Sequence, residues 1–437
     1  MTLLPLIMLP SPRLPVELCE FVIDNLDIVH DKATLLACSL TCKTFLHASR
    51  YHLFHHVQIP DARRAKRFLV IIRSSTHLST HLCAYVRQLT MVEGRSRNQY
   101  EPRWLKKALP ILTTCLLKVT VLRLDYLCWK HLNAAARTAI TSGFKKVKHL
   151  TILELKLETP QQLNQLIVSF PSLTHLECFH LYWKTDQRPV MPYTPLPRSL
   201  TNITMCGVQP SFFYELISLD PDHGVRALNL PYMNGAFADV GRILKTLGSR
   251  LECVDFRHLG YGHGLIHHRN PECAHLFFFQ SSLMEKIILS IPFFGGFFFL
   301  KTDVFTHDIN LAHNTHLRSI SLDCGFVNRG LNDPMDWVFT AFSRIISPHL
   351  EHVLLQLHIE DVANLDVVDW ARIDHITKQQ PWAAHLQRLT IHLSGPLAIR
   401  SEACRSVGSR LPLLNGCGIL SVEMGRNYHM FYNRMPD

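Results

Sequence analysis

Leu317-Arg-Ser-Ile320-Ser-Leu322 is one copy of a six-residue phrase that recurs between Val86 and Met424. In each copy the first, fourth and sixth residues are apolar. Twelve copies begin at Val86, Val119, Val147, Leu173, Leu200, Val225, Leu251, Met284, Leu317, Leu350, Leu386 and Ile419. Successive copies start 25 to 36 residues apart. A phrase that returns at a nearly fixed period is the sequence signature of a solenoid.

Each copy predicts a short strand, because its last two apolar residues are two positions apart and share one face. Between copies, apolar residues follow a helical period, as in Ala341, Phe342, Ile345 and Ile346. A unit of strand and helix cannot bury its apolar face alone, so neighbouring units must stack. The pattern resembles the leucine-rich repeat family. The expected fold class is α/β, with parallel strands inside and helices outside.

One position departs from that family. The Asn or Cys expected three residues after the last apolar position is replaced mostly by apolar residues, namely Leu127, Leu155, Leu181, Val208, Met233 and Leu259. We therefore expect irregular repeats, whose number at the two ends is open. An ordinary α/β domain with alternating strands and helices is the alternative.

Residues 1–60 are predicted to lie outside the repeats and to form three short helices. Leu18, Phe21, Val22 and Leu26 fall on one face of the first helix. Three helices of this length bury little surface by themselves. An apolar face left exposed on such a unit usually marks a docking site.

This segment resembles an F-box. The family's Leu-Pro-x-Glu opening and first helix correspond to Leu14, Pro15, Glu17, Leu18, Val22, Ile23 and Leu26. Its second stretch corresponds to Leu35, Cys38, Cys42, Lys43 and Phe45, and a basic-aromatic tail follows at residues 50–54. Thr41 and Phe45 depart from the aliphatic residue and the Trp that are common at their positions.

The resemblance implies a non-catalytic substrate receptor of a cullin-type (SCF) ubiquitin ligase. A Skp-type adaptor would link the F-box to the cullin, and the repeats would hold a protein substrate. The residues implied as adaptor contacts are Leu14, Pro15, Leu18, Ile23, Leu26, Leu36, Leu40, Cys42 and Phe45. Some of them must instead pack the core of the helices. The alternatives are a helical cap without an adaptor and a scaffold that works without ubiquitin.

The expected organisation is a flexible N-terminus (1–12), an F-box (13–60), a connecting helix or linker (61–85) and the repeats (86–437). Within each phrase, the residues that alternate with the apolar ones should face the concave side, where solenoids bind partners. The candidate substrate-binding residues are Arg123, Asp125, His149, His175, Glu177, Asn202, Asn229, Asp255, Arg257, Lys286, Ser321, Asp323 and Arg388. A solvated face without a ligand is the simpler interpretation of any one of them.

The charges of the candidate face and of the whole chain indicate which class of partner to expect. The candidate face is mixed in sign and no nucleic-acid motif is present, so we expect no nucleic acid as partner. The formal net charge of +10 favours an acidic or phosphorylated protein, although solvated basic faces would also explain it.

Signals for catalysis, cofactors and membranes are weak. The common nucleotide, zinc-protease and hydrolase motifs are missing, and no cofactor is expected. His263, His267, His268, Cys273 and His275 cluster in a long connection, but their spacing fits no common zinc site; a hidden active site there is a third alternative.

The cysteines and the most apolar run indicate the compartment. Thirteen cysteines without a CxxC pair indicate reduced thiols, hence a cytoplasmic or nuclear protein. The most apolar run, residues 287–300, is too short for a membrane span. We therefore expect no membrane role.

Overall fold

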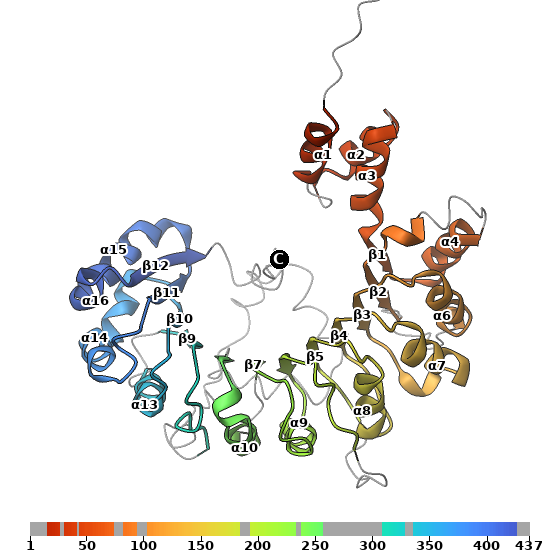
Figure 1. Cartoon of the computed structure of the whole chain (residues 1–437). Coiled ribbons are helices and arrows are strands. Elements are labelled where there is room, and N and C mark those ends of the chain that lie inside the picture. The colour runs from red at the N-terminus through yellow and green to blue at the C-terminus, as the bar shows by residue number, and fades with distance from the viewer. Residues whose placement is uncertain are drawn as a thin grey trace, which may run out of the picture. The chain divides into compact units, whose positions relative to one another are not determined.

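The computed structural model describes residues 15–26, 30–41, 43–73, 82–93, 103–183, 193–232, 237–256, 308–327 and 335–425. The chain forms two compact units. Unit 1 comprises Met1–Glu158 and Ser169–Leu173, and unit 2 comprises Thr159–Val168 and Thr174–Asp437. Figure 1 labels the helices and strands of both.

Unit 1 begins with helices and continues with alternating strands and helices. Its helices are α1 (Val16–Asp24), α2 (Lys32–Cys38), α3 (Lys43–His55), α4 (Ala62–Arg73), α6 (Arg103–Cys115), the 3-10 helix η1 (Trp129–His131) and α7 (Ala134–Gly143). Its strands are β1 (His56–Ile59), β2 (Gln88–Val92), β3 (Val121–Asp125) and β4 (His149–Leu153). Each of these strands pairs with the next in parallel.

Unit 2 repeats the same alternation. Its strands are β5 (His175–Phe179), β6 (Asn202–Cys206), β7 (Ala227–Tyr232), β8 (Cys253–Phe256), β9 (Ser319–Phe326), β10 (His352–His358), β11 (Arg388–Ser394) and β12 (Leu420–Gly425). Its α-helices are α8 (Pro160–Val168), α9 (Pro210–Ser218), α10 (Phe237–Leu247), α13 (Asp336–Arg344), α14 (Trp370–Gln379), α15 (Arg400–Arg410) and α16 (Pro412–Gly416). Its 3-10 helices are η2 (Gly248–Arg250), η3 (Val362–Val367) and η4 (Leu397–Ile399). In this unit, α9, α10, α13 and α14 lie on the outer side of the strands (Figure 1).

The predicted fold class is confirmed: twelve parallel strands follow the order of the chain in one open sheet. Eleven of the predicted phrases coincide with strands β2 to β12. The twelfth, which begins at Met284, lies outside the described residues. β8 pairs directly with β9, with Val254 in register with Ile320, so no strand separates these two in the sheet.

The sheet begins earlier than predicted. β1 pairs with β2, with Val57 opposite Leu89 and Ile59 opposite Met91. Phe54, Val57 and Ile59 occupy the first, fourth and sixth positions of the same phrase, which makes a further copy. The sequence interpretation assigned this copy to the tail of the three-helix segment. The boundaries proposed for the four segments stay a prediction.

The core lies between the sheet and its helices. The middle apolar residues of neighbouring phrases stand in register, as Ile203 with Leu228 and Val353 with Leu389, except at the last pair, where Leu389 lies opposite Leu420 and Val422 opposite Ile391. The side chains of Ile203, Leu228, Val353 and Leu389 are buried. The burial of apolar surface is the main term that stabilises such a stack. It contributes roughly 25 cal/mol per Å2.

The position after each strand where an apolar residue replaces the expected Asn or Cys has a structural explanation. Tyr126, Glu154, His180 and Gly207 each follow directly after a strand, and each has a positive φ between 50° and 60°. This left-handed residue turns the chain away from the sheet. The next residue in the first three cases is Leu127, Leu155 or Leu181, and all three are buried. An apolar side chain thus fills the place where the leucine-rich repeat pattern has Asn or Cys.

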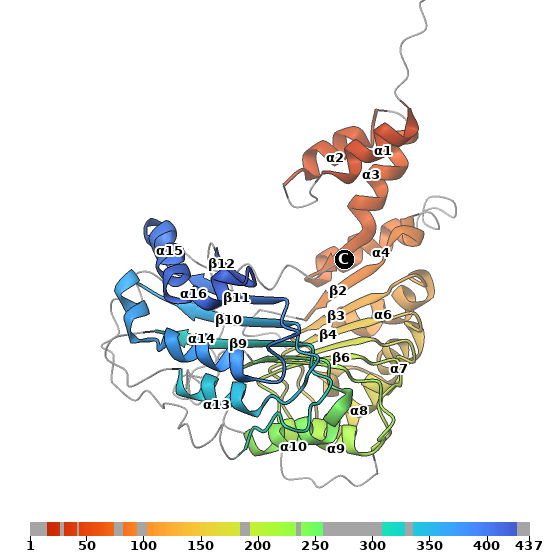
Figure 2. The same ribbon diagram turned by 60° about the vertical axis from the view of Figure 1, so that its left-hand side comes forward.

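The predicted three helices form as expected. α1 and α2 both pack on α3, which leads directly into β1 (Figure 2). Ile23 and Leu35 are the fully buried apolar side chains of these helices among the residues described. Asp24 accepts a hydrogen bond from His52 Nε2 at 2.7 Å, which ties α1 to α3.

Two further predictions concern thiols and membranes. The cysteines whose side chains the structure describes are all free thiols, and half of them are buried. Burial raises the pKa of Cys206 to about 12, so this thiol stays protonated and unreactive. Within the described ranges, no helix is both long and apolar enough to cross a bilayer.

Candidate functional site

Five large apolar side chains are exposed on the first two N-terminal helices and directly after them. On α1, Leu18, Phe21 and Val22 are 50%, 64% and 57% exposed. On α2 and directly after it, Leu36 and Leu40 are 50% and 87% exposed. We name these five residues the helical apolar face. Single exposed apolar residues are ordinary, but five on two adjacent short helices indicate an interaction site.

The structure divides the predicted adaptor contacts into three groups. Pro15, Leu18, Leu36 and Leu40 are exposed, while Leu26 and Phe45 are partly exposed. Ile23 is buried, so it packs the core of the helices and offers no surface to a partner. Leu14 and Cys42 lie outside the described residues. Phe21 was predicted to lie on the apolar face of the first helix but was not among the contacts.

The predicted substrate-binding residues fall into rows that run across the sheet. In unit 1, Arg123 lies opposite Thr90 and Thr151, and its Nε is 2.8 Å from Asp125 Oδ1. His149 starts β4 in register with Val121.

The rows in unit 2 cross more strands. His175 lies opposite Asn202, and Glu177 opposite Thr204. Asn229, Asp255 and Ser321 form a continuous row on β7, β8 and β9. Arg388 lies opposite His352. Arg257 and Lys286 lie outside the described residues.

This sheet face is not uniformly accessible. Asp125 and Asp323 are buried, so neither carboxylate presents a contact surface. On β11, burial lowers the pKa of His392, against the opposing pull of Glu423 and Asp323. Burial also lowers the pKa of His358 to about 4. Both imidazoles are therefore neutral near pH 7.

A buried carboxyl group stands out in unit 1. Glu93 follows β2, and its Oε2 accepts the backbone N–H of Cys128 at 2.9 Å. Burial raises the pKa of Glu93 to about 7, although that hydrogen bond and Lys106 act in the opposite direction. A carboxyl group poised near neutrality can serve in catalysis. Here a single hydrogen bond to backbone and a buried position fit a structural role.

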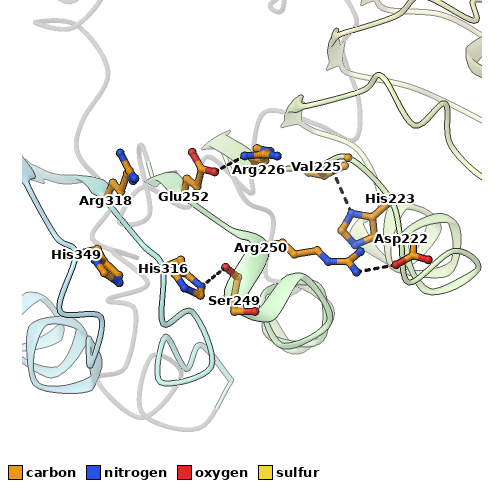
Figure 3. Close-up of a pocket in the computed structure, with 11 residues that line it drawn as sticks. Asp222, His223, Val225, Arg226, Ser249, Arg250, Glu252, His316, Arg318 and His349 are labelled. Carbon is orange, nitrogen blue, oxygen red and sulfur yellow. Dashed lines mark hydrogen bonds and ion pairs between the residues drawn. The ribbon is translucent and has the colours of Figure 1, made fainter.

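A pocket of about 440 Å3 lies in unit 2, where strands β7 to β10 begin (Figure 3). We name it the edge pocket. Its basic lining residues are Arg226, Arg250, Arg318, His223, His316 and His349. The sequence interpretation missed them, because it considered only residues that alternate with apolar ones inside the phrase. The signal was present: charged residues and histidines flank the first apolar position of successive copies, as in His316-Leu317-Arg318.

The predicted absence of a metal site remains a prediction. Among the described residues, no group of three or more histidine, cysteine or acidic side chains is placed to hold a metal ion. The histidine-rich segment 263–275 lies outside them.

Comparisons with known proteins add little. No family model and no curated protein matches the sequence. One similar solved structure is the complex of Rad7 and Elc1 in yeast, at 13% identity and a TM-score of 0.35. That similarity covers 86% of this chain and 88% of the other chain. The proposals below rest on the residues of this chain.

Proposed function

We propose that this protein is the non-catalytic substrate receptor of a cullin-type ubiquitin ligase. The helical apolar face would bind a Skp-type adaptor, which in turn binds the cullin. The sheet would hold a protein substrate, and no cofactor takes part. The protein would act in the cytoplasm, the nucleus or both.

The observation that carries the proposal is the exposure of Leu18, Phe21, Val22, Leu36 and Leu40. The F-box pattern in the sequence places its apolar residues on these same helices. A unit that buries Ile23 and Leu35 but exposes five apolar side chains gains stability from a partner surface. A few such anchors usually supply most of the binding energy of an interface.

The mechanism would be proximity. One end of the chain is anchored to the ligase while the other holds the substrate. A substrate lysine is thereby kept at high effective concentration near the charged ubiquitin-conjugating enzyme. No side chain of this protein needs to take part in the transfer of ubiquitin.

Co-purification of the intact chain with a Skp-type adaptor tests the proposal. The wild-type protein should retain the adaptor, and a variant with Leu18→Asp and Leu36→Asp should lose it, because two charges would have to be buried at the interface. Thr138→Asp, on the exposed surface of α7, is the matched control. Ubiquitin-remnant mapping in cells should lose the same substrates with the double variant. If the wild-type chain retains no adaptor, a scaffold that works without ubiquitin replaces the proposal.

A further inference from the structure

The edge pocket gathers three guanidinium groups, and carboxylates hold two of them firmly. Arg226 Nη1 lies 2.7 Å from Glu252 Oε1, and Arg250 Nη2 lies 2.9 Å from Asp222 Oδ1 (Figure 3). Arg318 makes a longer ion pair, 3.9 Å to Glu351, and its side chain is 59% exposed. A guanidinium has five N–H donors, so Arg318 retains donors for a ligand.

Two imidazoles beside Arg318 supply further donors. The Nδ1 of His316 lies 2.9 Å from the carbonyl oxygen of Ser249. Because a carbonyl only accepts, Nδ1 carries the proton and Nε2 is left for a proton or a ligand. The His349 ring stacks on it at 5.4 Å with an interplanar angle of 8°. In the part of the chain that the structure describes, the His349 ring makes no hydrogen bond.

The third imidazole has a different role. His223 is only 4% exposed, and its Nδ1 accepts the backbone N–H of Val225 at 3.3 Å. Burial, and then Arg250, lower the pKa of His223, so its ring is neutral near pH 7. His223 therefore shapes one wall of the pocket without adding charge.

The charges around the two stacked rings balance when the rings are neutral. They are Arg250 on η2, Arg226 and Glu252 before β7 and β8, Arg318 before β9, Glu351 before β10, and Asp222. Three positive charges face three negative ones. A proton on Nε2 of His316 would make this nitrogen a donor to a bound anion.

We propose that the edge pocket binds a phosphate group, which Arg318, His316 and His349 hold between them. A phosphate ester offers three acceptor oxygens and nearly two negative charges, which suit the guanidinium and the two imidazoles that line this pocket. A carboxylate offers two oxygens and one charge. The pocket of about 440 Å3 has one aliphatic lining residue, Val225, among those described, so it suits a polar group.

The phosphate would be carried by a substrate side chain, and this source rests on the proposed function. The pocket lies where strands β7 to β10 begin, at the edge of the sheet that would hold the substrate. A phosphorylated side chain of a substrate bound to the sheet would be presented to this edge. A free phosphate compound is the other source of the same chemistry.

Binding to the full-length chain should be measured at pH 6.5 and 8.0. The probes are a degenerate phosphoserine peptide pool, its unphosphorylated counterpart, and inorganic phosphate. We expect the phosphorylated pool to bind at least about tenfold more tightly than the unphosphorylated pool, the gain typical of charge-assisted hydrogen bonds. The preference for the phosphorylated pool should hold at both pH values, because a phosphate ester is charged at each.

Variants assign the binding to the pocket. Arg318→Gln should weaken phosphopeptide binding about tenfold, and Arg318→Lys, which keeps the charge, should weaken it less. His316→Gln with His349→Gln should also weaken phosphopeptide binding. Arg405→Gln, on the exposed surface of α15, is the matched control and should bind as the wild type does.

The outcomes distinguish a phosphorylated substrate, a free phosphate compound and a pocket that binds no phosphate. Inorganic phosphate that binds alone, and is lost with Arg318→Gln, supports the pocket with a free phosphate compound as ligand. Equal binding of both peptide pools without phosphate binding, or equal losses in Arg318→Gln and Arg405→Gln, overturns the proposal. Adaptor capture, measured on the same preparations, distinguishes the two proposals. The pocket variants should still retain the adaptor. If the wild-type chain binds phosphate but captures no adaptor, the pocket proposal stands and the ligase proposal fails.

Discussion

The N-terminal helices and the repeated strands use the same apolar residue types but bury them to opposite extents. Leu389 on β11 and Leu122 on β3 are 0% exposed, whereas Leu18 on α1 and Leu40 after α2 are 50% and 87% exposed. Each repeat is covered by the next one along the chain. Among the described residues, no element covers the outer face of the three helices, which is the face that we propose binds another molecule.

The energetic consequence follows from the exposed surface. Full burial of one leucine, valine or phenylalanine contributes roughly 1.5–3 kcal/mol. The five residues of the helical apolar face are about half exposed or more. They therefore retain several kcal/mol of potential stabilisation, on the order needed for a specific interface after the cost of association.

The largest effect should come from charge inside the stack. Leu389→Asp places a carboxylate between Val353 and Leu420, where no partner can reach it, and should destabilise unit 2 by about 4 kcal/mol or more. Thr390→Asp, on the other face of the same strand, lies between Leu354 and Ser421 and should cost less than about 1 kcal/mol. Chemical denaturation of both variants measures the contrast. Equal losses would mean that the two faces of the strand are wrongly assigned.

Within α1 the same contrast should appear on a smaller scale. Ile23→Ala removes a buried side chain and should destabilise the helices by about 2–4 kcal/mol. Leu18→Ala removes an exposed one and should change their stability by less than about 1 kcal/mol. Hydrogen exchange of the α1 amides in the isolated chain reports both changes. A large loss with Leu18→Ala would show that this residue belongs to the core.

Glu93 gives a pH-dependent test of burial in unit 1. Its pKa is raised by burial to about 7, so the folded chain binds a proton that the unfolded chain releases near pH 4.5. This carboxyl therefore costs stability increasingly as pH rises from 4.5 to 7, and the cost is constant above that. Glu93→Gln should match the wild type near pH 4 and exceed its stability by up to about 3 kcal/mol at pH 8. Thermal melting across that range would contradict the account if the difference did not grow with pH.

The sequence predicts the strands well because their signal is local. An apolar pair two residues apart identifies a strand such as Ile320 to Leu322 without knowledge of its neighbours. β1 was missed because the same residues, Phe54 to Ile59, also completed a different pattern. The sequence could not separate the exposed adaptor contacts from the buried ones. Leu18 and Ile23 follow the same helical periodicity, and only the packing of α1 on α3 distinguishes them.

The sequence could not predict the edge pocket, for a different reason. Arg226, Glu252 and Arg318 are 26 and 66 residues apart in the chain. Parallel register brings them to adjacent strands, as Ala227 with Cys253 and Cys253 with Ser319. Flanking charges in single repeats look like ordinary solvated residues, and their convergence is visible only once the register is known.

The affinity of the purified chain for a purified Skp-type adaptor tests the central contrast most directly. Titration calorimetry should show binding by the wild type, and Leu18→Ala with Phe21→Ala should weaken it about thirtyfold, equivalent to roughly 2 kcal/mol. Leu117→Ala removes a side chain that is 62% exposed outside the helices, and it should leave the affinity unchanged. A wild-type chain that does not bind the adaptor, or a double variant that binds as tightly as the wild type, would contradict the assignment of the helical apolar face as the docking site.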